Sequence, residues 1–203
     1  MADTTSATDR LDGGFADPVF NAQAAFSAIM GAFARPGTIV DLGGLARPPA
    51  PVPPAAGAFL AALADYDTPV WLDEAAFGTG IAEWLTFHTG ASIVADPAAA
   101  SFALACEPSA LPALSAFAVG TADFPDRSAT LILCLPGLRG GATWRLTGPG
   151  IETEAFASPQ GLPDNFHADW ADNRGLYPCG IDVLLVAGGE ALGLPRTTQI
   201  ADR

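Results

Sequence analysis

Two apolar runs constrain the fold of this 203-residue chain more than any other feature of its sequence. Residues 129–135 are nearly all apolar, and residues 181–187 repeat the pattern. A strand with apolar side chains on both sides must be covered on both faces, as in a sheet that lies between other layers. Half of all residues are hydrophobic, so the chain can supply that cover. The runs therefore predict central strands of a buried sheet.

Helical patterns interleave with the strand-like segments. Residues 18–34 carry apolar side chains three and four apart, with Asp17 as a predicted N-cap and Pro18 in the first turn. Shorter helices are expected over residues 55–64, 80–87, 108–117 and 162–174, and further strands over residues 38–42, 68–72, 91–94, 101–106 and 192–194. Residues 142–146 are predicted to pair antiparallel with residues 129–135. This alternation indicates an α/β fold with a mixed sheet.

The chain length fits one domain. Residues 1–14 are small, polar and end in glycine, so we expect a disordered N-terminal tail. Residues 15–203 are then expected to form a single α/β domain. The proline-rich residues 43–54 are interpreted as a loop within it.

The charge balance excludes several kinds of site. The net charge is −13, and all nine basic residues are arginine. Without lysine, the chain cannot form the lysine Schiff base that holds pyridoxal phosphate, so we expect no such cofactor. A P-loop lysine is excluded for the same reason. A strongly acidic chain repels phosphate backbones, so nucleic-acid binding is not expected.

The three cysteines are widely spaced and form no C-x-x-C pair. We therefore expect reduced thiols, no disulfide framework and no structural zinc or other metal site, with Cys106 and Cys134 as small core residues. Residues 48–64 are nearly uncharged but begin with several prolines, which argues against a membrane helix. A soluble cytoplasmic protein is expected.

His88 and Asp67 are the first candidate site residues. His88 follows a predicted helix and can act as a general base or contact an anion. The structural alternative, a histidine stabilised by the dipole at a helix C-terminus, is the more common case. Asp67 lies with Asp65 in a loop before a strand. The pair can serve acid–base chemistry or bind a divalent ion, or can simply form an Asx turn.

Two further segments can bind an anion. Arg145 precedes Thr147 and Gly148 in a glycine-rich turn, where backbone N–H groups and a guanidinium can meet a negative group. Arg196 and Thr197 follow a proline near the C-terminus and can contact a phosphate or carboxylate. A plain turn and a docked C-terminal arm are the structural alternatives.

Several segments, read in order, resemble one protein family. They are Phe20-x-x-Gln23-x-x-Phe26, Arg35-Pro36-Gly37, residues 65–72, residues 87–89, Gly120-Thr121, residues 129–133, residues 145–151, Pro178-x-Gly180-Ile181-Asp182 and residues 194–198. Their order and spacing are similar to those of the PhnH subunit family of the bacterial carbon–phosphorus lyase system.

The resemblance implies a three-layer α/β/α fold like the large domain of pyridoxal-phosphate-dependent transferases, without the cofactor. It implies a homodimer in isolation and partnership with the subunits PhnG, PhnI, PhnJ and PhnL. Together these subunits attach an alkylphosphonate to the ribose of ATP, which displaces adenine and gives a ribose 1-phosphonate 5-triphosphate. No catalytic residue is implied for this subunit.

The resemblance favours an auxiliary subunit of that complex, inactive by itself. The alternative is a stand-alone small-molecule enzyme in which His88, Asp67 and Arg145 converge on one pocket. A third hypothesis is a purely structural interaction module. The first two differ in whether the three polar residues meet.

Overall fold

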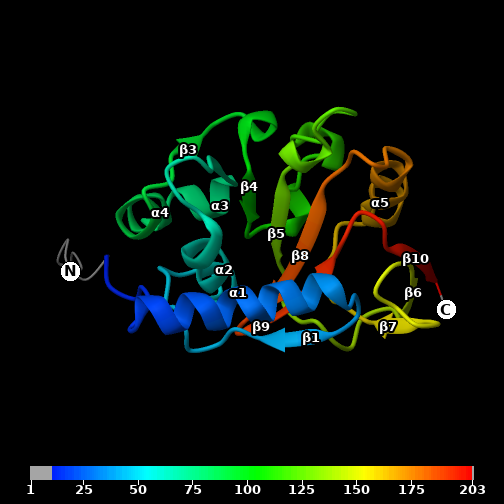
Figure 1. Cartoon of the computed structure of the whole chain (residues 1–203), viewed down its shortest axis with the longest axis horizontal. Coiled ribbons are helices and arrows are strands. Elements are labelled where there is room, and N and C mark those ends of the chain that lie inside the picture. The colour runs from blue at the N-terminus through cyan, green and yellow to red at the C-terminus, as the bar shows by residue number, and fades with distance from the viewer. Residues whose placement is uncertain (1–10, 203) are drawn as a thin grey trace.

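The computed structural model describes residues 11–202, and the central element of this part is a seven-stranded mixed sheet (Figure 1). Its strand order is β1-β9-β8-β5-β4-β2-β3. The bounds are β1 Ile39–Asp41, β2 Val70–Leu72, β3 Ile93–Val94, β4 Phe102–Ala105, β5 Thr130–Cys134, β8 Asp182–Ala187 and β9 Glu190–Leu194. Pairing is parallel from β3 through β8 and antiparallel at β9 and β1. The predicted mixed sheet is confirmed.

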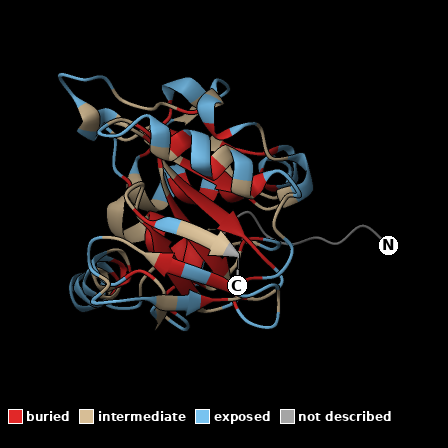
Figure 2. Ribbon diagram, turned by 90° about the vertical axis from the view of Figure 1, so that its right-hand side faces the viewer, coloured by how far each residue is buried: buried red, intermediate tan, exposed pale blue. Residues whose placement is uncertain are grey.

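Helices cover this sheet on both faces. They are α1 Pro18–Ala34, α2 Pro54–Leu63, α3 Glu74–Phe77, α4 Ile81–Thr89 and α5 Phe166–Gly175, with short 3₁₀ turns η1 Pro97–Ala99, η2 Pro108–Ala110, η3 Leu114–Ala116 and η4 Pro125–Arg127. Alternate residues of β5 point to opposite faces: Ile132 packs with the core under α1, α2 and α4, and Leu131 with the core under α5. Figure 2 shows the buried strands between more exposed layers.

Helix α1 begins where the sequence places its start. The Asp17 carboxylate accepts hydrogen bonds from the backbone N–H groups of Val19 and Phe20, both at 3.2 Å. The helix lies directly on β9, because a Cβ at Gly193 would lie 2.9 Å from the backbone of Ala32. Glycine at this strand position permits the close approach.

A second sheet of three strands forms beside the large one, in the order β10-β6-β7. Its bounds are β6 Trp144–Thr147, β7 Ala155–Ala157 and β10 Gln199–Asp202. The prediction that residues 142–146 pair with residues 129–135 is wrong. Both edges of β5 are already taken by β4 and β8, so β6 pairs with β7 and β10 instead.

The described end of the predicted N-terminal tail is held in place. The Asp12 carbonyl accepts a hydrogen bond from Trp84 Nε1 at 2.9 Å, and the Gly13 carbonyl accepts one from the Arg47 N–H at 2.7 Å. Disorder is therefore wrong for residues 11–14, because distant parts of the chain satisfy their backbone groups. Residues 1–10 of the predicted tail lie outside the described residues.

Two predicted helices differ from the structure. Residues 108–117 form the separate turns η2 and η3 with an extended segment between them, and α5 begins at Phe166 rather than at residue 162. Pro112 lacks the backbone N–H that a continuous helix needs at that position, and Pro163 disfavours a helical conformation at Leu162 before it. Among residues 11–202, no helix has the length and apolarity needed to cross a membrane.

Candidate functional site at the carboxyl ends of the parallel strands

The connections that follow β2 and β4 leave the sheet on opposite faces. After β2 the chain forms α3, whose Ala76 belongs to the core under α1, α2 and α4. After β4 it passes through η3, whose Leu114 belongs to the core under α5. Adjacent parallel strands with diverging connections leave a crevice at their carboxyl ends, where ligands bind in open α/β sheets. This edge is the candidate site.

Asp73 holds the edge together. Its carboxylate is buried and follows β2 directly. Oδ1 accepts a hydrogen bond from Ala76 N–H at 2.8 Å, and Oδ2 accepts hydrogen bonds from the N–H groups of Cys106 and Glu107 at 2.7 and 2.8 Å. The carboxylate therefore caps α3 and joins the end of β2 to the end of β4.

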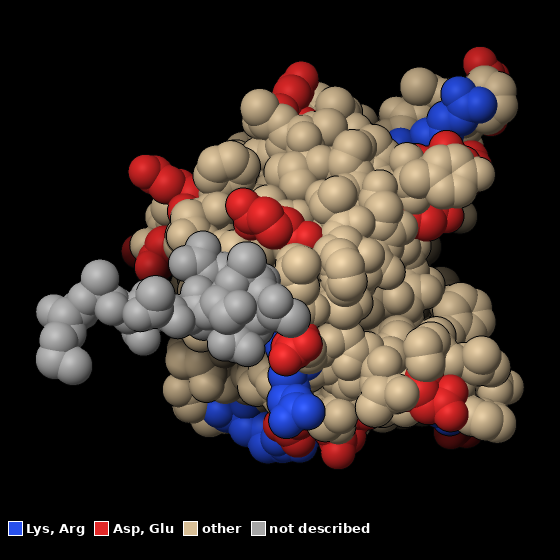
Figure 3. All heavy atoms as spheres, turned by 90° about the vertical axis from the view of Figure 1, so that its left-hand side faces the viewer, with Lys and Arg blue, Asp and Glu red and all other residues tan. Residues whose placement is uncertain are grey.

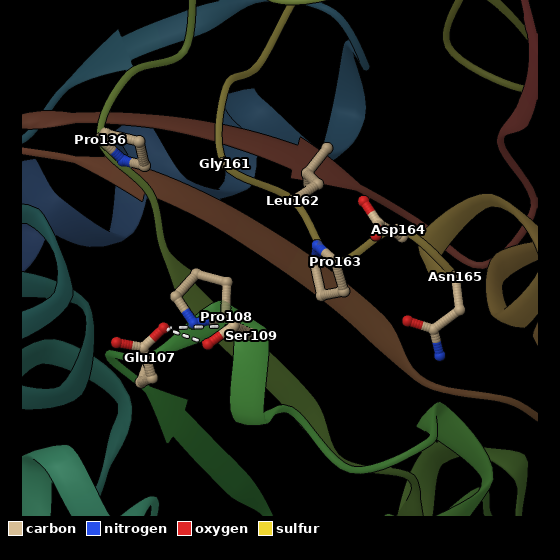
Figure 4. A pocket seen from close by; sticks show the side chains of 9 residues that line it. All are labelled: Glu107, Pro108, Ser109, Pro136, Gly161, Leu162, Pro163, Asp164 and Asn165. Carbon is tan, nitrogen blue, oxygen red and sulfur yellow. Dashed lines mark hydrogen bonds between the residues drawn. The ribbon is translucent and has the colours of Figure 1, made fainter.

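Two hollows flank this edge and share Glu107. The smaller, of about 410 Å³, is lined by Trp71, Asp73, Glu74, Ala75, Glu107 and Ala110. The larger, of about 510 Å³, is lined by Glu107, Pro108, Ser109, Pro136, Gly161, Leu162, Pro163, Asp164 and Asn165 (Figure 4). In the figure, Glu107 and Ser109 come from one side and Asp164 and Asn165 from the other.

The charged groups that line both hollows are carboxylates. Glu107 Oε1 accepts hydrogen bonds from Ser109 Oγ at 2.6 Å and Ser109 N–H at 3.3 Å, which fixes its position. A triphosphate or phosphonate placed here would meet negative charge without a compensating cation. The crevice has the location of a ligand site, but its lining alone does not suit an anion.

The sequence reasoning missed Asp73 and Glu107. Each directly follows a predicted strand, residues 68–72 and 101–106 respectively, and both strands belong to one parallel set. Carboxyl ends of parallel strands meet at one edge, so polar residues directly after successive buried strands were the available signal.

The structure places His88 at the C-terminal end of α4. Its Nε2 lies 2.7 Å from the Leu11 carbonyl oxygen and donates the hydrogen of that contact. The ring also packs against Trp84 and Phe87, with centroids 4.7 and 5.0 Å apart. The contact with the Leu11 carbonyl ties this residue to the helix.

Asp67 lies in the turn between α2 and β2. The Asp65 carboxylate accepts hydrogen bonds from Asp67 N–H at 2.9 Å and Thr68 Oγ1 at 3.1 Å, so the segment is an Asx-type turn. This turn is close to the end of α4, because a Cβ at Gly90 would lie 3.7 Å from Tyr66 Cβ.

Arg145 and Thr147 lie in β6 of the three-stranded sheet, and Gly148 and Thr197 lie just outside its strands. Arg145 Nη1 is 4.0 Å from Glu154 Oε2, and Thr147 pairs with Gln199 of β10. Gly148 has a φ of +135°, and a Cβ there would lie 3.0 Å from the Thr197 carbonyl oxygen. Glycine thus permits the turn to pack on the C-terminal arm. Whether these four residues bind an anion stays a prediction.

The three residues of the stand-alone enzyme hypothesis do not converge. His88 is on α4 and Arg145 is on β6, and Figure 1 places these elements at opposite ends of the molecule. General acid–base cooperation needs groups within hydrogen-bonding reach or one water apart. The arrangement does not support that hypothesis.

Arg196 joins three segments of the chain. Its Nη2 lies 2.6 Å from Asp182 Oδ2 and 2.5 Å from Ser128 Oγ, and its backbone N–H donates to Asp182 Oδ1 at 2.7 Å. Nη1 donates to the carbonyl oxygens of Pro125 and Pro178 at 3.0 and 3.4 Å. The Arg196 and Asp182 side chains are 14% and 25% exposed. The guanidinium is thus engaged internally, and an anion would have to displace these partners.

Comparison with known proteins decides the family. The model of the family described as "Bacterial phosphonate metabolism protein (PhnH)" matches residues 13–201. The chain belongs to the PhnH family. It is 43% identical over 196 residues to alpha-D-ribose 1-methylphosphonate 5-triphosphate synthase subunit PhnH of Rhizobium meliloti (strain 1021), which covers 97% of this chain and 98% of that protein. The predicted PhnH resemblance is confirmed.

A shorter match joins a second phosphonate-related protein. HtxG of Stutzerimonas stutzeri, described as a candidate C-P lyase subunit, is 33% identical over 82 residues, or 40% of this chain and 42% of HtxG. Both relatives are named as subunits of larger enzymes.

We predict that Arg196→Lys lowers the free energy of unfolding by about 3 kcal/mol, because a lysine cannot reproduce the paired contacts to Asp182 and leaves that carboxylate partly unsatisfied. Urea denaturation followed by fluorescence measures the change. Arg145→Ala is the control: its exposed ion pair should cost less than about 1 kcal/mol. Equal losses in the two variants would contradict the structural role of Arg196.

Proposed function

We propose that this chain is an auxiliary subunit of the enzyme complex that forms ribose 1-alkylphosphonate 5-triphosphate from ATP and a phosphonate in organic phosphonate catabolism. The near full-length match to a synthase subunit is the observation that carries this proposal. The chain works with the other carbon–phosphorus lyase subunits PhnG, PhnI, PhnJ and PhnL. It is inactive without them.

The shortage of cationic groups supports the proposal that this chain depends on its partner subunits to bind ATP. The net charge is −13, the hollows at the carboxyl edge are lined by carboxylates, and Arg196 is engaged internally. Figure 3 shows one face of the molecule, where acidic groups are scattered over a largely uncharged surface and basic groups lie near its margins. Such a surface does not attract a triphosphate. Cations for ATP must come from partner subunits or Mg²⁺.

Helix α1 supports assembly through an exposed apolar surface. Its 17 residues include no charged side chain, and Val19, Phe20, Phe26 and Met30 are 48–73% exposed. Val19, Phe26 and Met30 recur at helical spacing on one side of the helix. Exposure of large apolar side chains to water is unfavourable in a monomer. We therefore propose that a second copy of the chain packs against this side of α1, which we call the α1 face.

The ends of α1 make this surface self-complementary. Asp17 caps its N-terminus and Arg35 its C-terminus. In an antiparallel pair with a twofold axis at Phe26, midway between them, each Asp17 faces the partner's Arg35 end and the two helix dipoles oppose. Acidic chains otherwise repel each other. An uncharged contact with complementary ends therefore favours a homodimer through α1.

The remaining features of the proposal follow from composition. We propose that the chain works without pyridoxal phosphate, since it contains no lysine to hold it. We also propose that its layered sheet resembles the large domain of the transferases that use that cofactor. We also propose a cytoplasmic location, where ATP is available.

The purified chain is predicted to release no adenine from ATP and methylphosphonate, because it lacks the cations that the triphosphate needs. Chromatographic detection of free adenine measures this. Co-expression with the neighbouring subunits should restore adenine release and retain this chain in the purified complex. Adenine release by the chain alone, in proportion to its concentration, would overturn the auxiliary role.

We predict that Phe26→Glu converts the isolated dimer to a monomer, since two carboxylates would face each other at the axis. Light scattering coupled to size-exclusion chromatography measures the mass. Phe77→Glu is the matched control, because Phe77 is 62% exposed on α3, and it should leave the dimer intact. A monomeric unsubstituted chain, or a Phe26→Glu dimer of unchanged affinity, argues against the α1 face.

A further inference from the structure

Two of the three cysteines meet at the carboxyl edge of the sheet. Cys106 directly follows β4, and Cys134 is the last residue of β5. Ala105 pairs with Leu133 in the parallel ladder, which brings the next residues of both strands side by side. The two Sγ atoms are 3.6 Å apart. The sequence alone did not predict this pair, because its members are 28 positions apart.

The two thiols differ in access. Cys134 is 7% exposed and belongs to the core under α1, α2 and α4, whereas Cys106 is half-buried. Cys106 is also held firmly, since its backbone N–H donates to Asp73 Oδ2. Its neighbour Glu107 lines both hollows. Because Cys106 is the more exposed thiol, a small molecule from solvent can approach it before Cys134.

The surroundings of Cys134 also affect its protonation. The pKa of Cys134 is raised, first by its hydrogen bond to Cys106 and then by burial, with further contributions from the charges of Cys106 and Asp73. Cys134 therefore favours its protonated form, which makes it the poorer attacking thiol. Once Cys106 is bonded to another sulfur, its contributions to the raised pKa of Cys134 disappear.

We propose that Cys106 and Cys134 form a thiol–disulfide exchange site, with Cys106 as the attacking thiol, Cys134 as the resolving thiol and a small organic disulfide as the substrate. This site goes beyond the proposed subunit function and does not depend on it. The strand spacing of about 4.8 Å lies within the Cα separation that a disulfide requires.

The exchange balances in two steps. The Cys106 thiolate attacks one sulfur of the disulfide RSSR, the S–S bond breaks, and RS⁻ leaves and takes a proton from water. Cys134 then gives its proton to a solvent base, and its thiolate attacks Cys106 Sγ to release the second RSH. The small disulfide is reduced to two thiols as the two cysteines are oxidised. The product links the ends of β4 and β5.

The test uses the full chain with Cys179→Ser, which removes the third thiol. Dithiodipyridine, an uncharged disulfide whose released thiol absorbs in the near ultraviolet, is the probe. We expect about two equivalents of released thiol per chain, no retained adduct by intact mass, and a cross-linked peptide containing Cys106 and Cys134 after digestion. Adding Cys134→Ser should give about one equivalent and a stable adduct on Cys106. Adding Cys106→Ser should slow the reaction at least about tenfold, since Cys134 is buried.

A stable adduct on Cys106 in the Cys179→Ser chain, with no cross-linked peptide, would overturn the proposal. Fast reaction of the chain that retains only Cys134 would overturn the assigned order of attack. The digest of the Cys179→Ser chain, which keeps both thiols, tests for the Cys106–Cys134 disulfide directly, even if a serine at residue 134 disturbs folding. Release of the linkage by dithiothreitol, with return of the original mass, supports reversible exchange.

Discussion

The structure depends on covering a parallel group of strands on both faces. Strands β2, β4, β5 and β8 carry apolar side chains toward two separate cores, one under α1, α2 and α4 and one under α5 and the small sheet. Strands buried in this way leave few places for polar groups except where each strand ends. Asp73 and Glu107 stand at such ends, and the buried Asp73 carboxylate is satisfied by three backbone N–H groups. The same constraint that builds the core therefore creates the crevice and sets its acidic character.

That acidic character limits what the chain does alone. The carboxyl edge has the shape and location of a binding crevice, yet carboxylates supply its charge. Arg196, the arginine that sequence reasoning offered to an anion, is tied to Asp182, Ser128 and two carbonyl groups. Membership of the PhnH family and the close relation to a synthase subunit fit a chain that contributes structure and contact surface to an assembly. The uncharged α1 face is the surface of this kind that the described residues present most openly.

Local patterns in the sequence predicted the main elements well. The run at residues 181–187 became β8, and the Asp17 cap and the helix at residues 18–34 became α1. Prediction failed where distant partners decide the outcome. Residues 142–146 pair with the C-terminal strand β10, which no periodicity near them reveals. Arg196 presents the same guanidinium to an anion or to Asp182, and only the fold shows which partner is near. The roles of Asp73 and Cys106 became visible only once the strand order placed both residues at the carboxyl edge of the sheet.

Calorimetric titration of ATP into the isolated, full-length chain without metal tests the central claim most directly. An acidic surface whose crevice lacks cations should bind the nucleotide with a dissociation constant weaker than about 0.1 mM, and the assembled complex should bind it more tightly. Tighter binding than this by the chain alone would show that it handles the triphosphate itself, and would contradict the account.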